Sequence, residues 1–193
     1  MERELKIALP DRVSFERVLQ VLGDPDQTID QVNYYFDTGE EFLRKSHATV
    51  RVRNEGDKVL LTLKRGTQKS DGYFESEEIE DPLESGSFSP ESFDPYAEDT
   101  RVGRVLIADY GGPRLSCLGS IENRRRVFKL EHGIKIELDE TRFPGDRTEF
   151  EIECESEDEL LAREKVSEII RKAGVRARPQ TKTKHQRFLR YRV

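Results

Sequence analysis

The sequence has few of the residues that build disulfide frameworks or zinc sites. Its 193 residues include two cysteines, three histidines, one methionine and no tryptophan. Two cysteines exclude a framework of several disulfides, and the histidines lack the spacing of zinc ligands. We therefore expect Cys117 and Cys154 to be small apolar groups, and His47, His132 and His185 to lie on the surface.

Long apolar runs are also absent, and acidic residues outnumber basic ones. No run approaches the ~20 apolar residues of a membrane-spanning helix, and the N-terminus lacks a secretory signal pattern. The formal net charge of −6 argues against a nucleic-acid-binding surface. We expect a cytoplasmic protein with no membrane partner and no stable nucleic-acid complex. The basic segment 181–192 is the exception, and alone it reads as a solvated end or a weak RNA patch.

Short alternating runs dominate the rest of the chain. Charged residues make up 37% and hydrophobic residues 34%, a thin core for one domain over residues 1–193 unless some of the charge is internal. Apolar and polar residues alternate with the period of half-buried strands. The predicted strands are residues 2–9, 32–38, 48–54, 58–64, 73–80, 124–130, 134–140 and 149–155.

Three stretches have helical periodicity, and one stretch reads as a loop. The helices are predicted at residues 11–22, 97–110 and 156–174. The last has a capping box of Ser156 and Glu159 and a stop at Gly174. The Pro, Ser and Gly residues of 81–95 predict a surface loop or lid. Consecutive strands with few helices indicate an antiparallel α+β domain.

Like charges recur two residues apart on the predicted strands, where they share one face. The pairs are Glu2 with Glu4, Arg51 with Arg53, Glu75 with Glu77, and Glu151 with Glu153. Each pair alone is typical of a solvated face, but together they repel, and a bound ion or polyanion would neutralise them. Closing about eight strands into a barrel would gather these faces into a charged tunnel, with the helices packed on the apolar outside.

Such an interior has a recognisable chemistry. Carboxylate clusters are the hard oxygen ligands that Mg²⁺ and Mn²⁺ prefer. Arg and Lys bind phosphate, Arg through its planar fork and Lys as a point charge. No glycine-rich phosphate loop is present. The combination therefore suits a phosphate chain that carries a metal ion.

The chain opens on ERELK at residues 2–6, and VRVR, LTLK, ESE, NRRRVF, ELDET, EIE and a late TK follow in order. This set of motifs resembles the CYTH domain family, the triphosphate tunnel metalloenzymes, in which the opening carries the signature ExExK. The resemblance spans essentially the whole chain. The segment from ENRRRVFKL to EFEIECESED is most similar to the plant-type inorganic tripolyphosphatase branch.

The resemblance implies a set of site residues. One group would hold one or two Mg²⁺ or Mn²⁺ ions: Glu2, Glu4, Asp139, Glu151 and Glu153. Another would bind phosphate and act in catalysis together with Glu2 and Glu4: Lys6, Arg51, Arg53, Lys64, Arg125 and Lys184. An acidic residue of the middle strand, Glu75 or Glu77 with Glu78 as the alternative, would complete the substrate site. Arg124 and Arg126 remain alternatives to Arg125, and Lys135 is either solvated or at the tunnel mouth.

The resemblance also implies an activity. We expect a monomeric, divalent-metal-dependent triphosphatase in which an activated water attacks a terminal phosphoryl group, with inorganic tripolyphosphate as the substrate. Ca²⁺ should inhibit, because its looser coordination would not position the water. The alternatives within the family are a class IV adenylyl cyclase and a thiamine triphosphatase. An alternative from another class is a polyphosphate-binding module without catalysis.

Overall fold

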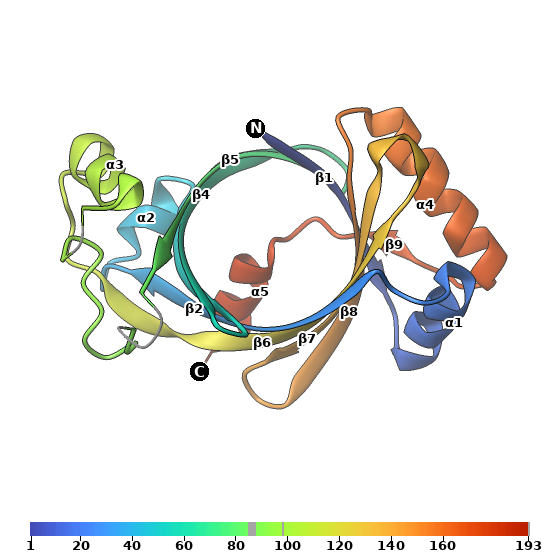
Figure 1. The fold of residues 1–193 in the computed structure, drawn as a ribbon, viewed down its shortest axis with the longest axis horizontal. Helices are drawn as coiled ribbons and strands as arrows, with labels where there is room; N and C mark the ends of the chain where they lie inside the picture. The colour runs from blue at the N-terminus through green and yellow to red at the C-terminus, as the bar shows by residue number, and fades with distance from the viewer. Residues whose placement is uncertain (85–87, 98, 193) are drawn as a thin grey trace.

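Eight antiparallel strands close into a barrel in the computed structural model, which describes residues 1–84, 88–97 and 99–192 (Figure 1). The order around the barrel is β1-β5-β4-β3-β2-β6-β7-β8, and β8 returns to β1. The predicted closed barrel is confirmed. Its strands are β1 (Glu2–Leu9), β2 (Gln27–Asp37), β3 (Ala48–Glu55), β4 (Lys58–Ser70), β5 (Tyr73–Leu83), β6 (Ser116–Lys129), β7 (Lys135–Phe143) and β8 (Arg147–Glu155).

The strand register places the charged positions inside and the apolar positions outside. β1 pairs with β5 through Glu2↔Ser76 and with β8 through Lys6↔Glu153. The alternate residues Leu5 and Ile7 are buried against helices on the outer face. Successive residues of each strand thus alternate between a polar interior and an apolar exterior. This is the reverse of a usual sheet, which turns its polar face to solvent and its apolar face to the core.

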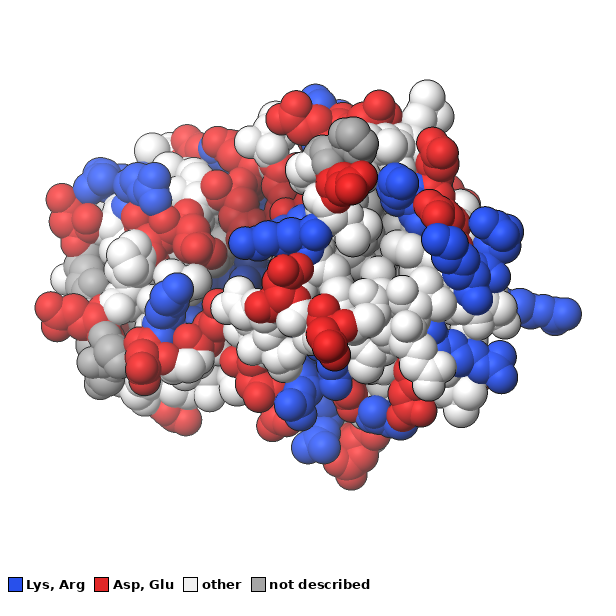
Figure 2. Space-filling view, turned by 45° about the vertical axis from the view of Figure 1, so that its right-hand side comes forward, with Lys and Arg blue, Asp and Glu red and all other residues white. Residues whose placement is uncertain are grey.

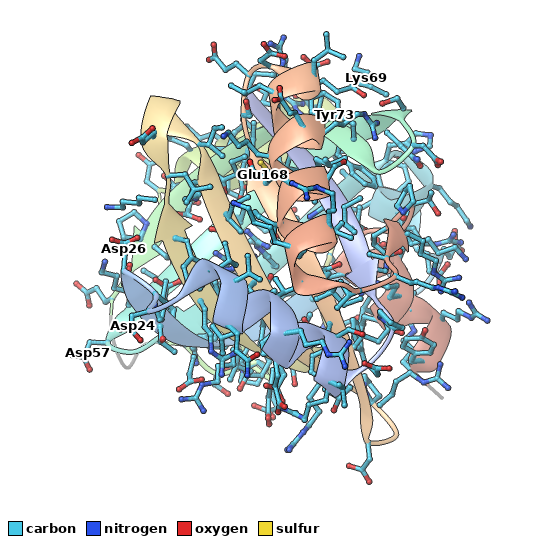
Figure 3. The ribbon with its side chains drawn as sticks, turned by 90° about the vertical axis from the view of Figure 1, so that its right-hand side faces the viewer. Asp24, Asp26, Asp57, Lys69, Tyr73 and Glu168 are labelled. Atoms are coloured by element: carbon cyan, nitrogen blue, oxygen red, sulfur yellow. The ribbon has the colours of Figure 1, made fainter. Side chains whose placement is uncertain are left out.

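Helices α1 (Arg12–Leu22) and α4 (Glu159–Ala173) cover one side of the barrel (Figures 1 and 3). The α4 N-cap differs from the prediction: Asp158 accepts from the backbone N–H groups of Leu160 and Leu161. Ser156 lies two residues earlier, where its hydroxyl accepts from the backbone of Asp158. A carboxylate at the N-cap also complements the helix dipole.

The opposite side of the barrel is covered by α2 (Phe42–Lys45), α3 (Arg101–Tyr110) and the segment before α3. β5 continues to Leu83, so the predicted loop 81–95 begins as a strand. Phe88 and Phe93 pack on Phe36 with ring centroids 6.3 and 4.9 Å away. Residues 85–87 lie outside the described part. Residues 88–97 therefore cover apolar side chains on the outer face of the barrel.

Helix α5 (Lys184–Tyr191) packs across one end of the barrel and is seen through the ring in Figure 1. The short strand β9 (Arg178–Pro179) pairs with β1 and leads the chain toward it. Phe188 of α5 packs with Tyr35, Ile121 and Phe143. The start of α5 consequently reaches the charged interior. Among the described helices, none has the length and apolar character needed to cross a membrane.

Candidate functional site

The barrel encloses a cavity of about 670 Å³ lined by side chains from all eight strands and from the start of α5. In Figure 2, acidic and basic side chains meet where this face of the molecule is hollowed. Charged side chains in such a cavity need partners of opposite charge, because an isolated buried charge costs free energy. Two groups of side chains in this region differ in how their charges are paired.

One wall is a trio of buried carboxylates, here called the acidic wall. It consists of Asp139, Glu151 and Glu153, which are 0%, 1% and 3% exposed. Asp139 on β7 stands opposite Glu151 on β8, so the antiparallel register brings them together. Oxygen atoms of the three residues lie within 4.8 Å of one another. This spacing and donor type suit a hard divalent cation.

Lys184, at the first position of α5, lies against the acidic wall. Its Nζ is 2.7 Å from Asp139 and 2.8 Å from Glu153, and it also pairs with Glu151. The helix thus delivers a positive charge to the centre of the trio. Burial works against the charge on Lys184, but the three carboxylates outweigh it and raise the pKa of the ammonium.

Lys6 and Arg125 compensate the same carboxylates from β1 and β6. Lys6 Nζ lies 2.5 Å from Glu153 and 2.8 Å from Glu4. The Arg125 guanidinium lies 2.7 Å from both Asp139 and Glu153. Burial alone would raise the pKa of Asp139, but the neighbouring cations, Arg125 foremost, lower it to about 2. The same balance holds the pKa of Glu153 well below its ordinary value.

A second group of ion pairs crosses the closure between β1, β5 and β4. Lys64 Nζ lies 2.5 Å from Glu2, 3.2 Å from Glu4 and 3.4 Å from Glu78. Arg51 on β3 donates to Glu78 at 2.7 Å. Burial would raise the pKa of Glu78, but Arg51 and Lys64 lower it to about 2. Glu78 is therefore ionised at neutral pH and held by two cations.

Arg53 contrasts with the other cations of the cavity. Its Nε donates to the Asn33 side-chain oxygen at 3.0 Å, and it contacts no carboxylate among the described residues. Burial foremost, with repulsion from Arg51 and Arg125, lowers its pKa to about 10, although Glu78 and Glu55 attract it from beyond ion-pair distance. Arg53 thus keeps its positive charge without an ion pair to any carboxylate in the described part of the chain.

Asn33 belongs to a row of neutral side chains, here called the amide wall. The row consists of Gln31, Asn33 and Asn123, all nearly buried and all lining the cavity. Asn123 donates to Gln31 at 3.2 Å and accepts from Thr141 at 2.7 Å. This arrangement satisfies the amides internally, so the wall adds polarity without adding charge.

A CYTH domain model matches residues 1–189. The chain belongs to the CYTH domain family. YjbK of Bacillus subtilis (strain 168), a candidate triphosphatase by name, is 28% identical over 195 residues, covering 97% of this chain and 96% of its own. The resemblance predicted from the motifs is therefore confirmed.

Solved CYTH-like structures share the fold. HpAC1 from Hippeastrum is 26% identical with a TM-score of 0.89, covering 100% of this chain and 97% of its own; its structure is described as revealing a dominant triphosphatase activity. A Bacillus halodurans protein described as a candidate adenylate cyclase is 23% identical with a TM-score of 0.75, covering 97% and 99% of the two chains. The second likeness concerns the fold alone.

The structure brings most of the predicted site residues of this CYTH chain together. Those bordering the cavity are Glu2, Glu4, Lys6, Arg51, Arg53, Lys64, Glu75, Arg125, Glu153 and Lys184. Asp139 and Glu151 lie directly behind this surface, where they contact Lys184. Lys135 lies at the rim, where it pairs with Glu137 at 3.0 Å and with Glu155 at 2.6 Å.

The middle strand differs from the prediction by one position. Glu75 borders the cavity, but its carboxylate pairs with Arg3 at 3.1 Å, and that Arg3 side chain is 43% exposed. Glu77 lies outside the cavity and pairs with Arg65 at 2.8 Å on the outer surface. The alternative, Glu78, faces inward. The pairing Glu2↔Ser76 sets this parity, so Ser76 and Glu78 share the inner face.

The run of three arginines resolves in favour of Arg125. Arg124 is exposed and lies 3.7 Å from Asp30. Arg126 lies over the ring of Phe15 at 5.0 Å, on the outer face. Arg125 alone of the three reaches the acidic wall, because strand alternation turns only the middle residue inward.

Several cavity residues were missed by the sequence reasoning. Glu137 has the parity of Asp139 and could have been found from it; burial foremost, with Glu153 adding to it, raises its pKa to about 7. The amides of the amide wall carry no charge and gave no such signal. His185, predicted to lie on the surface, is buried: its Nδ1 lies 3.0 Å from the Thr49 hydroxyl. The His132 side chain lies outside the described part.

Arg187 is a further buried cation of the basic end. It lies 2.8 Å from Glu149 and 2.6 Å from Glu151, behind the acidic wall. Lys184, His185, Arg187 and Phe188 therefore face the barrel rather than form a solvated tail, although Lys182 and Gln186 are exposed. The basic character of this segment is matched by the acidic character of β8.

Proposed function

We propose that this CYTH protein is a divalent-metal-dependent triphosphatase that hydrolyses inorganic tripolyphosphate inside the barrel. One observation carries the proposal: a single cavity is lined by six inward cations and by Glu153, one member of a buried carboxylate trio whose other members lie directly behind the surface. Phosphate groups need the former and a hard metal ion needs the latter. The name of YjbK, a candidate triphosphatase, and the dominant triphosphatase activity described for HpAC1 support the same reaction.

The cations would bind the phosphate chain and stabilise charge that develops on the leaving phosphate. They approach from different strands and from α5, and so surround the cavity: Lys6, Arg51, Arg53, Lys64, Arg125 and Lys184. Ion pairs hold five of them at fixed positions before substrate arrives. Such preorganisation lowers the reorganisation required in the transition state.

The acidic wall fits a divalent metal ion, with Glu2 and Glu4 as further oxygen donors. All its donors are carboxylates, which favour Mg²⁺ or Mn²⁺ over ions that select sulfur or imidazole. A bound ion would supply Lewis-acid stabilisation of phosphoryl oxygens. Lys184 contacts every member of the trio, so an ion and the Lys184 ammonium would compete for the same oxygens.

Direct attack by water fits this cavity better than a covalent enzyme intermediate. The Thr49 hydroxyl does meet His185 Nδ1, but burial lowers the pKa of that imidazole to about 4, which makes it a weak base. The Ser76 hydroxyl donates to Glu2 at 3.3 Å, and Glu2 is also paired with Lys64. Neither hydroxyl has the strong base that a nucleophile requires.

A phosphate-release assay tests the proposal. Tripolyphosphate, thiamine triphosphate and ATP would be compared with Mg²⁺, with Mn²⁺, with Ca²⁺ and with EDTA. We expect the highest kcat/KM for tripolyphosphate with Mg²⁺ or Mn²⁺, inhibition by Ca²⁺ and no turnover in EDTA. Cyclic AMP from ATP would instead favour a cyclase. Tight tripolyphosphate binding without phosphate release under any metal would favour a binding module.

A further inference from the structure

Two arginines on the same strand face are held in different ways. Arg51 and Arg53 lie two residues apart on β3, and both line the cavity. Arg51 is neutralised by Glu78 at 2.7 Å. Arg53 instead donates its Nε–H to the neutral Asn33 at 3.0 Å. The register pairs Asn33 directly with Arg53, so the contact is built into the β2–β3 ladder.

The neutral partner has a consequence for anion binding. A guanidinium has five N–H donors, and the contact with Asn33 uses only the one on Nε. The two Nη groups keep their donors for a bidentate phosphate contact. A carboxylate partner would cancel the charge of Arg53, and an incoming phosphate would then have to displace it. An amide fixes the orientation of the side chain and leaves its full charge available.

The surrounding side chains keep this arrangement stable. Asn33 is 3% exposed, and the adjacent amides are bonded to one another rather than to a cation. Gln31 donates to Glu55 at 2.9 Å, which ties the row to the end of β3. The negative charges of the acidic wall are held by Lys184, Lys6 and Arg125 and so do not need Arg53.

We propose that Asn33 is a positioning residue that orients Arg53 without neutralising it, and thereby sets the affinity of the cavity for the phosphate chain. This inference rests on the proposed function, because it assigns a role in binding the same substrate. Asn33 acts through Arg53: it supplies orientation, and Arg53 supplies charge.

Asn33→Asp tests the electrostatic part, since it keeps the shape of the side chain and gives Arg53 an anionic partner. Binding of sodium tripolyphosphate in EDTA would be measured by calorimetry, and KM and kcat with Mg²⁺. Losing one charge-assisted contact weakens binding by about 10- to 100-fold, and we expect this loss in Kd and KM for Asn33→Asp. The melting temperature of the ligand-free variant should be unchanged or raised. Gln27→Glu, an exposed residue of the same strand, adds the same charge outside the cavity and should leave Kd unchanged.

A double-mutant cycle of Asn33→Ala and Arg53→Ala tests whether Asn33 acts through Arg53. In the parent background we expect Asn33→Ala to weaken binding about 5-fold through lost orientation, and in the Arg53→Ala background to have no further effect. Equal losses in both backgrounds, or a parental Kd for Asn33→Asp, would overturn the inference. If the parent protein itself neither binds nor hydrolyses tripolyphosphate, the proposed function fails instead, so the two failures are distinguishable.

Discussion

The acidic wall and the amide wall both arise from strand alternation, but they differ in how their charged groups are paired. In the acidic wall, three buried carboxylates each contact at least one cation, and the pKa of Asp139 and of Glu153 is lowered. In the amide wall, neutral side chains bond to one another, to Glu55 and to Arg53, a cation with no ion pair among the described residues. One wall holds its charges in pairs, and the other leaves one charge free.

The difference follows from what each wall is proposed to bind. Metal ions bind to carboxylates, which need counter-charges in the protein while no ion is present because bare buried anions are costly. Phosphate binds to cations, and a cation that is already paired gives up part of its attraction. A cavity for both ligands is therefore expected to pair its anions fully and to leave a cation available. The predictions below test this division.

The largest effect is expected at Glu153, which lies 2.5 Å from Lys6, 2.7 Å from Arg125 and 2.8 Å from Lys184. Glu153→Gln leaves these buried cations one carboxylate short. Breaking a buried pair costs about 3–5 kcal/mol, so the midpoint of urea unfolding should fall markedly. Hydrolysis should also fall, by about 10²- to 10³-fold, through misplaced phosphate-binding groups.

Glu168→Gln is the matched control for this prediction. Glu168 lies on the exposed face of α4, where it pairs with Lys172 at 2.7 Å (Figure 3). A surface change of this kind alters stability by less than about 0.5 kcal/mol. If Glu153→Gln were equally mild, the acidic wall would not need its full set of carboxylates.

The next largest effect compares Lys64→Ala with Arg53→Ala in the ligand-free protein. Lys64 compensates Glu2, Glu4 and Glu78, so its removal should destabilise by about 1–3 kcal/mol. Arg53 makes no ion pair with a described carboxylate, and repulsion from Arg51 and Arg125 exceeds the attraction of the more distant Glu78 and Glu55, so its removal should be neutral or stabilising. Both variants should bind tripolyphosphate more weakly than the parent, with a Kd that can still be measured. Equal destabilisation in thermal unfolding would contradict the distinction between the walls.

Part of this difference between the walls can be predicted from local sequence, and the rest depends on long-range strand pairing. The alternation of Arg51 and Arg53, and of Glu151 and Glu153, predicted a charged interior because strand periodicity is local. Local periodicity could not decide whether Glu77 or Glu78 faces the interior. Its inward parity follows from the pairing of β1 with β5 across 74 residues of chain, which no local pattern reveals.

The roles of the amide wall and of α5 could not be predicted from the sequence for a different reason. Asn33 matters because the β2–β3 register places it opposite Arg53, and a neutral residue gives no charge pattern to notice. His185 and Arg187 lie in a basic segment that reads as solvated until β8 supplies its carboxylates. Tertiary pairing, rather than local propensity, decides the environment of such residues.

The last effect appears only on acidification and concerns His185, which follows Lys184 in α5 and bonds to Thr49 on β3. Burial, with Arg192 and Arg44 adding to it, lowers the pKa of His185 to about 4 from an ordinary value of 6.5. The unfolded chain therefore takes up a proton below pH 6.5, while the folded chain does so only near pH 4. Folding stability should fall as the pH falls through this window.

His185→Gln removes this titration and keeps a polar partner for Thr49. The difference in unfolding free energy between parent and variant should change by up to about 3 kcal/mol between pH 6.5 and 4, and should stay constant below pH 4. Asp139 and Glu78, with pKa values of about 2, affect both proteins alike at lower pH. His47→Gln, at an exposed position, should match the parent throughout. Urea unfolding at half-unit pH steps measures the difference, and a parental profile for His185→Gln would show that the imidazole takes up its proton as readily in the folded protein as in the unfolded chain.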